Sequence, residues 1–186
     1  MNKTRKMAFS AMIIAIILLM AAVPFLGYIQ VGVMAITIIH IPTIIGSISF
    51  NERSLALISG TTFGVSSWLV AMFRPSSIAD IVFQNPLVSV LPRILFALIA
   101  FYLFKKLVEV INNKTFALAL TSAIATFLHT VMVLGMIFIF ARHSFPEGFT
   151  QVLMAVFSIN SVLEIIAAVI VVPPIVMVLN KTIKIS

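Results

Sequence analysis

Five polar side chains lie within strongly apolar stretches of this sequence, and their chemistry suits the recognition of a small polar ligand. They are Asn85, Arg93, His129, Asn160 and Glu164. A guanidinium offers forked donors that match a carboxylate, whereas amides and an imidazole can hydrogen-bond hydroxyl and amide groups. An ionisable group at membrane depth costs roughly 2.5–3.5 kcal/mol on insertion scales, so it usually persists where it faces protein, water or a ligand. The set is therefore a candidate site for an anionic or carbonyl-bearing ligand, with Arg93 as its cation.

The two polar residues nearest the C-terminus share one helix face, because Asn160 and Glu164 are four residues apart. They can therefore meet the same partner. A structural alternative needs no ligand: Arg93 and Glu164 form a buried ion pair while the amides bridge helices, since charges buried in membranes commonly pair with each other. His129 can likewise hydrogen-bond across helices. The residue types alone leave both interpretations open.

Two further side chains have more than one interpretation. Trp68 is the only tryptophan, and it is either an interfacial anchor or an apolar wall of a ligand pocket. His40 stands shortly before Pro42 in an apolar run, where a structural or coupling role competes with ligand contact. We include Trp68 among the candidate ligand-binding residues.

Motifs that carry catalysis are absent from the sequence. It has no His-Glu-x-x-His motif, no Gly-x-Ser-x-Gly elbow, no Gly-rich phosphate loop with Lys and no paired acidic residues. The histidines His40, His129 and His143 lie in separate segments without metal-ligand spacing, and there is no cysteine. We therefore expect no enzyme activity, no ATP hydrolysis, no bound metal and no cofactor.

Composition places the polar set in a membrane protein. Hydrophobic residues make up 62% of the 186 residues and charged residues 9%, with a mean hydropathy of +1.23. Soluble domains are roughly half apolar and a quarter charged. The polar intervals are too short for a soluble domain, so residues 1–186 are expected to form a single integral membrane domain. Its predicted fold class is all-α, a compact multi-pass bundle of transmembrane helices.

Six apolar runs are long enough to cross a membrane, which takes about 20 residues of helix. Their approximate bounds are 7–28, 32–50, 55–73, 87–104, 115–141 and 151–179. The even number of runs and the basic residues at both ends predict that the N- and C-termini are cytoplasmic. Nine of the twelve Lys and Arg residues then lie on the cytoplasmic side, with Arg74 and Arg142 outside. This topology explains the net charge of +7 without a nucleic-acid partner.

Small residues recur along the first run, at Ala8, Ala11 and Ala15. Small side chains at three- and four-residue spacing let two helices approach closely in lipid. From spacing alone, the simplest interpretation is packing inside the bundle.

Several strings together resemble the substrate-binding (S) components of energy-coupling factor (ECF) vitamin transporters. They lie at residues 11–15, 36–46, 85–93, 160–164 and 172–175. The resemblance covers essentially the whole chain, from the basic N-terminus to the last apolar run, and it is strongest to the pantothenate-specific members.

This resemblance implies a vitamin receptor in the bacterial cell membrane, with a pocket near the external side. Such components work with a transmembrane coupling subunit (EcfT) and two cytoplasmic ATPases, and they contact membrane lipid. The resemblance implies that Ala8, Ala11 and Ala15 dock on the coupling subunit. It makes the five polar residues and Trp68 the candidate substrate-binding set.

Pantothenate fits this set because it is an anion with an amide and two hydroxyls, facing one cation and several neutral hydrogen-bonding groups. Glu164 departs from this account, since a carboxylate facing the ligand would repel the anion. A hydroxymethylpyrimidine or pyridoxine compound is therefore an alternative, and riboflavin is a weaker one because few aromatic residues lie near the polar set. Outside the family, the rivals are a self-sufficient channel or secondary carrier and a structural membrane scaffold.

Overall fold

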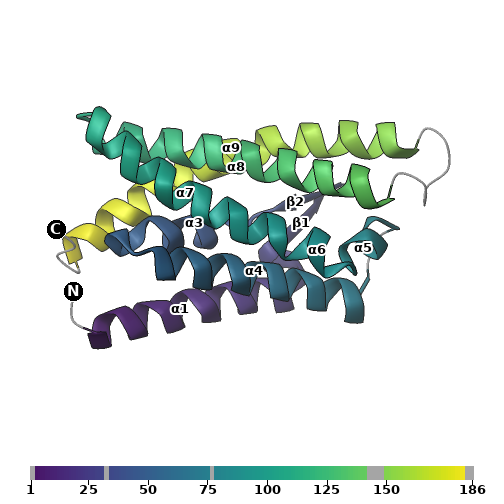
Figure 1. Cartoon of the computed structure of the whole chain (residues 1–186), viewed down its shortest axis with the longest axis horizontal. Helices are drawn as coiled ribbons and strands as arrows, with labels where there is room; N and C mark the ends of the chain where they lie inside the picture. Colours follow the sequence, from purple (N-terminus) through teal and green to yellow (C-terminus); the bar gives the residue numbers. More distant parts are fainter. Residues whose placement is uncertain (1–2, 32–33, 76–77, 142–148, 183–186) are drawn as a thin grey trace.

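The computed structural model describes residues 3–31, 34–75, 78–141 and 149–182, and these form a helical bundle with one small hairpin (Figure 1). Five long helices run roughly along the bundle, while the hairpin and a short helix lie among them. The elements are α1 Lys3–Ala22, α2 Pro24–Gly27, β1 Tyr28–Val31, β2 Met34–Thr37, α3 His40–Ile48, the 3-10 turn η1 Ser49–Asn51, α4 Arg53–Phe73, α5 Ile78–Phe83, α6 Pro86–Ser89, α7 Leu91–Val110, α8 Lys114–Ala141 and α9 Phe149–Thr182.

Within the described residues, five helices are long and apolar enough to cross a membrane. They cover Lys3–Ala22, Arg53–Phe73, Pro86–Val110, Lys114–Phe140 and Ile159–Lys181. Each overlaps one of the six predicted runs, which confirms the prediction of a multi-pass membrane protein. Arg142, which is predicted to be external, lies outside the described residues together with positions 143–148.

The remaining predicted span, at 32–50, is not one continuous helix. Its first described residues form β2, which pairs antiparallel with β1 in a register that places Thr37 opposite Tyr28. The hairpin was absent from the all-α prediction. A run of β-branched residues before His40 favours extended backbone. Pro42 then lies in the first turn of α3, where a proline is tolerated because that turn needs no backbone donor.

Helix α3 is the centre of the bundle. All nine of its residues are buried, and it packs against α1, α4, α7 and α9. Its hydroxyls bond to its own backbone: Thr43 Oγ1 donates to Ile39 O at 3.2 Å, and Ser47 Oγ donates to Thr43 O at 2.6 Å. These bonds satisfy the hydroxyls without a partner from another helix. At about 1.5 Å per residue, α3 is only ~14 Å long, roughly half of a membrane crossing.

Helices α4 and α7 approach each other closely where α4 carries glycine. A Cβ on Gly60 would lie 2.7 Å from the Cβ of Ala97, and one on Gly64 would lie 2.8 Å from the Cα of Val90. Such distances leave no room for a side chain. The Gly-x-x-x-Gly spacing thus seats α4 against the beginning of α7, as small residues do in membrane helix pairs.

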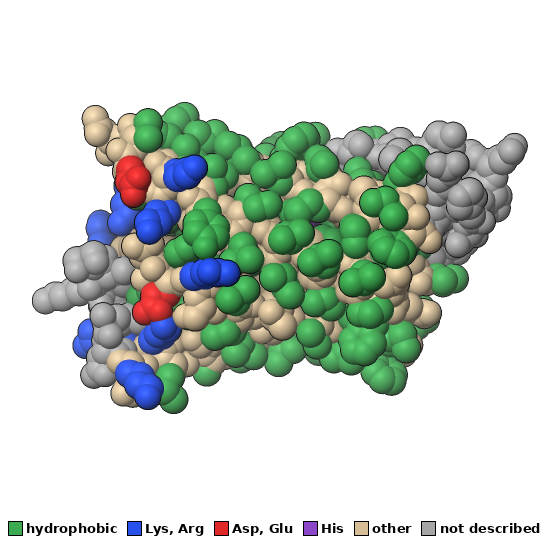
Figure 2. Space-filling view, in the orientation of Figure 1, with side chains coloured by type: hydrophobic (Ala, Val, Ile, Leu, Met, Phe, Trp, Pro, Cys, Tyr) green, Lys and Arg blue, Asp and Glu red, His purple; other side chains and the backbone are tan. Residues whose placement is uncertain are grey.

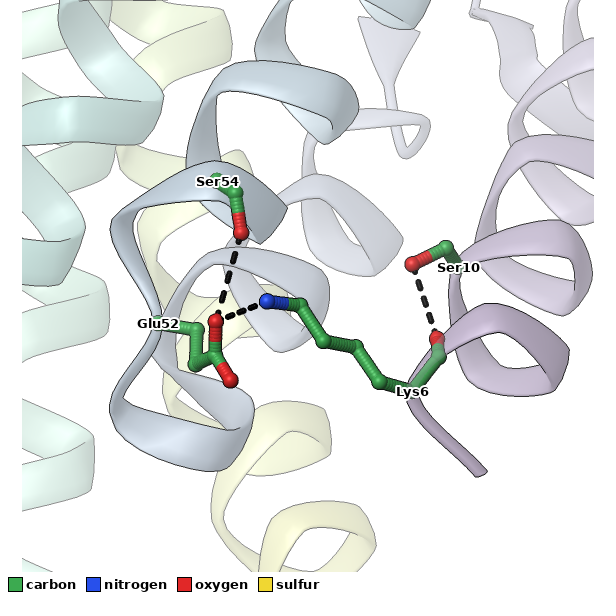
Figure 3. Close-up of polar contacts among 4 residues, drawn as sticks. All are labelled: Lys6, Ser10, Glu52 and Ser54. Atoms are coloured by element: carbon green, nitrogen blue, oxygen red, sulfur yellow. Dashed lines mark hydrogen bonds and ion pairs between the residues drawn. The ribbon is translucent and has the colours of Figure 1, made fainter. Parts of the chain in front are cut away.

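The beginning of α1 and the end of α9 lie at the same end of the bundle (Figure 1). Most of the Lys and Arg side chains visible in Figure 2 gather at that end, and hydrophobic side chains are spread over much of the remaining described surface in this view. Here Lys6 of α1 forms an ion pair with Glu52, which precedes α4 (Figure 3). Hydrogen bonding from the Lys6 ammonium lowers the pKa of the Glu52 carboxyl.

Candidate functional site

Arg93 lies in the first turn of α7, and its side chain is only 7% exposed. Its Nη1 donates to the carbonyl oxygen of Val88 at 2.7 Å. The guanidinium carbon lies 4.9 Å from the ring centre of Phe83 and 5.6 Å from that of Phe63, within the range of cation–π attraction. A cation is therefore held in the interior by one carbonyl and two aromatic faces.

The chain before Arg93 makes a compact double bend. The Asn85 side chain caps α6 by accepting from the Leu87 backbone N–H at 3.0 Å, and Pro86 follows as the first helical residue. The Ser89 hydroxyl donates to the carbonyl oxygen of Phe83. The Asn85 amide oxygen thus shapes the bend that carries Arg93.

Two side-chain bonds attach this bend to α4. Trp68 Nε1 donates to the carbonyl oxygen of Gln84 at 2.9 Å, and Gln84 Nε2 donates to the carbonyl oxygen of Ala71 at 3.2 Å. The indole of Trp68 is half-buried. Trp68 therefore holds the segment that positions Arg93, and its place among the candidate ligand-binding residues stays a prediction.

His129 of α8 lies against the same aromatic group as Arg93. Its side chain is 6% exposed, and its ring centre lies 4.8 Å from that of Phe96 and 5.7 Å from that of Phe63. Neither ring nitrogen makes a hydrogen bond within the described part of the chain. Buried polar atoms normally have a partner, so this imidazole has hydrogen-bonding capacity that a ligand or a water molecule can use.

Asn160 and Glu164 are both buried on α9, at 4% and 7% exposure, as their four-residue spacing predicted. Glu164 Oε1 accepts a hydrogen bond of 2.7 Å from the backbone N–H of Thr37. Among the described residues, Glu164 is hydrogen-bonded to Thr37 and forms no ion pair with Arg93. The direct ion pair of the structural alternative is therefore not seen between these two side chains.

We call Arg93, His129, Asn160 and Glu164 the polar core, because these four buried side chains come from α7, α8 and α9. Asn85 and Trp68 instead support the bend that leads to Arg93. Sequence reasoning missed Phe63, whose ring contacts both Arg93 and His129. Nothing in the sequence distinguishes it among sixteen phenylalanines, except its place between Gly60 and Gly64.

The predicted docking strip lies on the outer surface. Ala8, Ala11 and Ala15 are exposed on α1, whereas the opposite face of this helix is buried through Phe9, Ile13, Ile17 and Ala21. The strip therefore does not pack inside the bundle. It leaves α1 with a flat exposed face along its first half.

Beside the strip lies a groove of about 340 Å³, which we call the apolar groove. Side chains of α1, α9 and the segment around α3 line it, and all of them are apolar: Met12, Ile13, Ile16, Met20, Ile38, Ile41, Pro42, Ile45, Val171, Ile175 and Leu179. With no polar group to orient a ligand, it lacks the chemistry of a vitamin site. It offers nondirectional packing for an apolar surface.

Comparison with known proteins bears on both regions. The family model described as "ECF transporter, substrate-specific component" matches residues 5–176. The chain is 32% identical over 185 residues to the pantothenate transporter PanT of Leuconostoc mesenteroides, covering 92% of this chain and 90% of that protein. It is 30% identical over 158 residues to the pantothenic acid transporter PanT of Lactococcus lactis subsp. cremoris, covering 78% of each chain.

Proposed function

This chain belongs to the family of substrate-specific components of ECF transporters, and from that premise we propose that it captures pantothenate for uptake into the cell. The family is one of transporter components and not of enzymes, which agrees with the absence of catalytic motifs in the sequence. The observation that carries the substrate proposal is the burial of the Arg93 cation against the same Phe63 ring as His129, whose ring nitrogens make no hydrogen bond within the described residues.

Each proposed contact follows from the chemistry of pantothenate. Its carboxylate suits the Arg93 guanidinium, which offers donors in a forked arrangement. Its hydroxyls and amide suit the His129 imidazole and the Asn160 amide, which are both buried. The two relatives named as pantothenate transporters support this substrate over the other vitamins.

Asn85 and Trp68 enter the proposal as supports of Arg93. Asn85 caps the helix immediately before Arg93, and Trp68 fixes the preceding turn to α4. If the cation were loosely held, binding would have to order its side chain and backbone, and this cost would weaken the affinity for the ligand. Asn85 and Trp68 therefore contribute to binding because they hold Arg93 rigidly, and they do so without contacting the vitamin.

The exposed face of α1 is the proposed docking surface for the transmembrane coupling subunit (EcfT), which works with two cytoplasmic ATPases. Ala8, Ala11 and Ala15 present a flat strip to the membrane. In lipid, no hydrophobic force drives helices together, so association depends on close packing. Small residues of this kind permit that close approach. Basic side chains at the end where α1 begins and α9 ends support a cytoplasmic placement of both termini.

The direct test is to identify the ligand. Protein purified gently from cells grown in vitamin-rich medium is analysed by mass spectrometry, and equilibrium binding is then measured with pantothenate, pyridoxine, hydroxymethylpyrimidine and riboflavin. We expect pantothenate alone to co-purify and bind. Tight binding of another vitamin would overturn the substrate, and uptake into liposomes by this chain alone would favour a self-sufficient carrier.

A further inference from the structure

Three elements meet at the backbone of Thr37, the last residue of β2. Its N–H donates to Glu164 Oε1 of α9 at 2.7 Å, and its carbonyl oxygen lies 2.6 Å from Nδ1 of His40, the first residue of α3. The side chains of Glu164 and His40 are both buried. The backbone N–H and C=O of one residue thus tie the end of the hairpin to α9 and to α3, and β2 packs beside α9 accordingly (Figure 1).

The directions of these two bonds fix the chemistry of the partners. A carbonyl oxygen can only accept, so His40 Nδ1 must carry the hydrogen. A backbone N–H can only donate, so the contacting oxygen of Glu164 must accept. Any side chain with an acceptor oxygen in the place of Oε1 can satisfy this second role, whether or not it carries a charge.

The location of this junction connects the two regions of the molecule. Glu164 lies one helical turn from Asn160 on α9, and both side chains are buried. On the other side, Ile38 and Ile41 flank the junction and line the apolar groove. A backbone polar group buried at membrane depth needs a partner, and for Thr37 both partners are side chains from other elements.

We propose that Thr37, His40 and Glu164 form a clasp that positions the hairpin and α3 against α9, so that Glu164 acts through the Thr37 backbone and not by contacting the vitamin. The part concerning vitamin binding rests on the proposed function. The clasp removes the difficulty that a carboxylate in the polar core poses for an anionic ligand, because the Thr37 N–H occupies an oxygen of Glu164. Glu164 is then a positioning residue, and its charge is dispensable.

The test compares two substitutions of one residue. Glu164→Gln keeps an acceptor oxygen and loses the charge, whereas Glu164→Ala loses both. Hydrogen–deuterium exchange of the Thr37 amide is measured in the full-length ligand-free protein, and pantothenate affinity is measured separately. Leu163→Ala, at an exposed position beside Glu164 on the same helix, serves as the matched control.

We expect Glu164→Ala to accelerate Thr37 exchange by about tenfold, equivalent to about 1.4 kcal/mol, because the buried backbone N–H loses its acceptor. Pantothenate affinity should fall in the same variant. Glu164→Gln should retain most of the protection and most of the affinity, and the control should resemble the wild type. If Glu164→Ala fails to fold, His40→Phe is measured instead, because it keeps a ring and removes the donor to the Thr37 carbonyl.

Two results would overturn the clasp. Unchanged Thr37 exchange in Glu164→Ala, or in His40→Phe where that variant replaces it, would show that the bonds contribute nothing. Lost affinity with retained protection in Glu164→Gln would show that the charge acts on the ligand directly. Failure of the wild type to bind pantothenate would overturn the proposed function alone, because exchange in the ligand-free protein still decides whether the clasp exists.

Discussion

The polar core and the apolar groove differ in the chemistry of the side chains that form them, and they depend on different physics. The core relies on directional contacts, such as the bond from Arg93 to the Val88 carbonyl and the rings around His129. The groove is lined by apolar side chains only. Directional contacts discriminate between ligands, whereas apolar packing depends mainly on shape and buried area. Under the proposed function, recognition belongs to the polar core and partner contact to the outer face of α1.

The largest effect should come from filling the docking strip. Ala11→Trp or Ala15→Trp places a bulky ring on a surface that needs close helix approach, so uptake by the assembled transporter should fall to background. Pantothenate binding by the isolated subunit should persist, because both positions face away from the polar core. Loss of uptake and binding together would contradict separate roles for the docking strip and the polar core.

The next largest effect should come from the buried cation. Arg93→Ala removes the charge-assisted bonds to a carboxylate, so affinity for pantothenate should fall by about tenfold or more. Equilibrium binding on purified protein measures this loss. Arg74→Ala is the matched control, because Arg74 binds the carbonyls of Ala21 and Ala22 at the end of α1 and should leave affinity unchanged. Wild-type affinity in Arg93→Ala would remove Arg93 from the site.

A smaller effect should follow from loosening the support of Arg93. Trp68→Phe keeps an aromatic ring and removes the bond to the Gln84 carbonyl, which is worth about 0.5–1.5 kcal/mol in typical cases. Pantothenate affinity should therefore fall in Trp68→Phe, but by a smaller factor than in Arg93→Ala. A loss as large as that of Arg93→Ala would mean that Trp68 contacts the ligand itself. Dissociation rates measured for both variants make the comparison sharper.

The smallest effect should come from a pair that belongs to neither region. The bond from Lys6 lowers the pKa of Glu52, so the pair contributes stability above the unfolded carboxyl pKa and loses it as the pH falls through the lowered value. Both side chains are partly exposed, and exposed pairs contribute little. Melting temperatures of wild type and Glu52→Gln should differ slightly at pH 7 and converge in acid. Equal differences at every pH would contradict this account.

Sequence reasoning located the long helices and the polar residues, because a continuous apolar run and a buried charge both leave a signal in composition. It failed at 32–50, since mean hydropathy is the same for a spanning helix and for a hairpin followed by a short helix. It also could not find the role of Thr37, because Thr37 contacts Glu164 through its backbone N–H, a group that every residue except proline carries. Phe63 was missed because aromatic contacts depend on three-dimensional packing.

The short length of α3 bears on how the protein assembles in the bilayer. A helix of nine residues is too short to be stable across lipid alone, whereas the five long helices can each insert independently. Its backbone ends and the adjoining strand are protected only once α1, α4, α7 and α9 surround α3. We therefore expect this segment to be synthesised early but to reach its final structure only after the later helices have inserted.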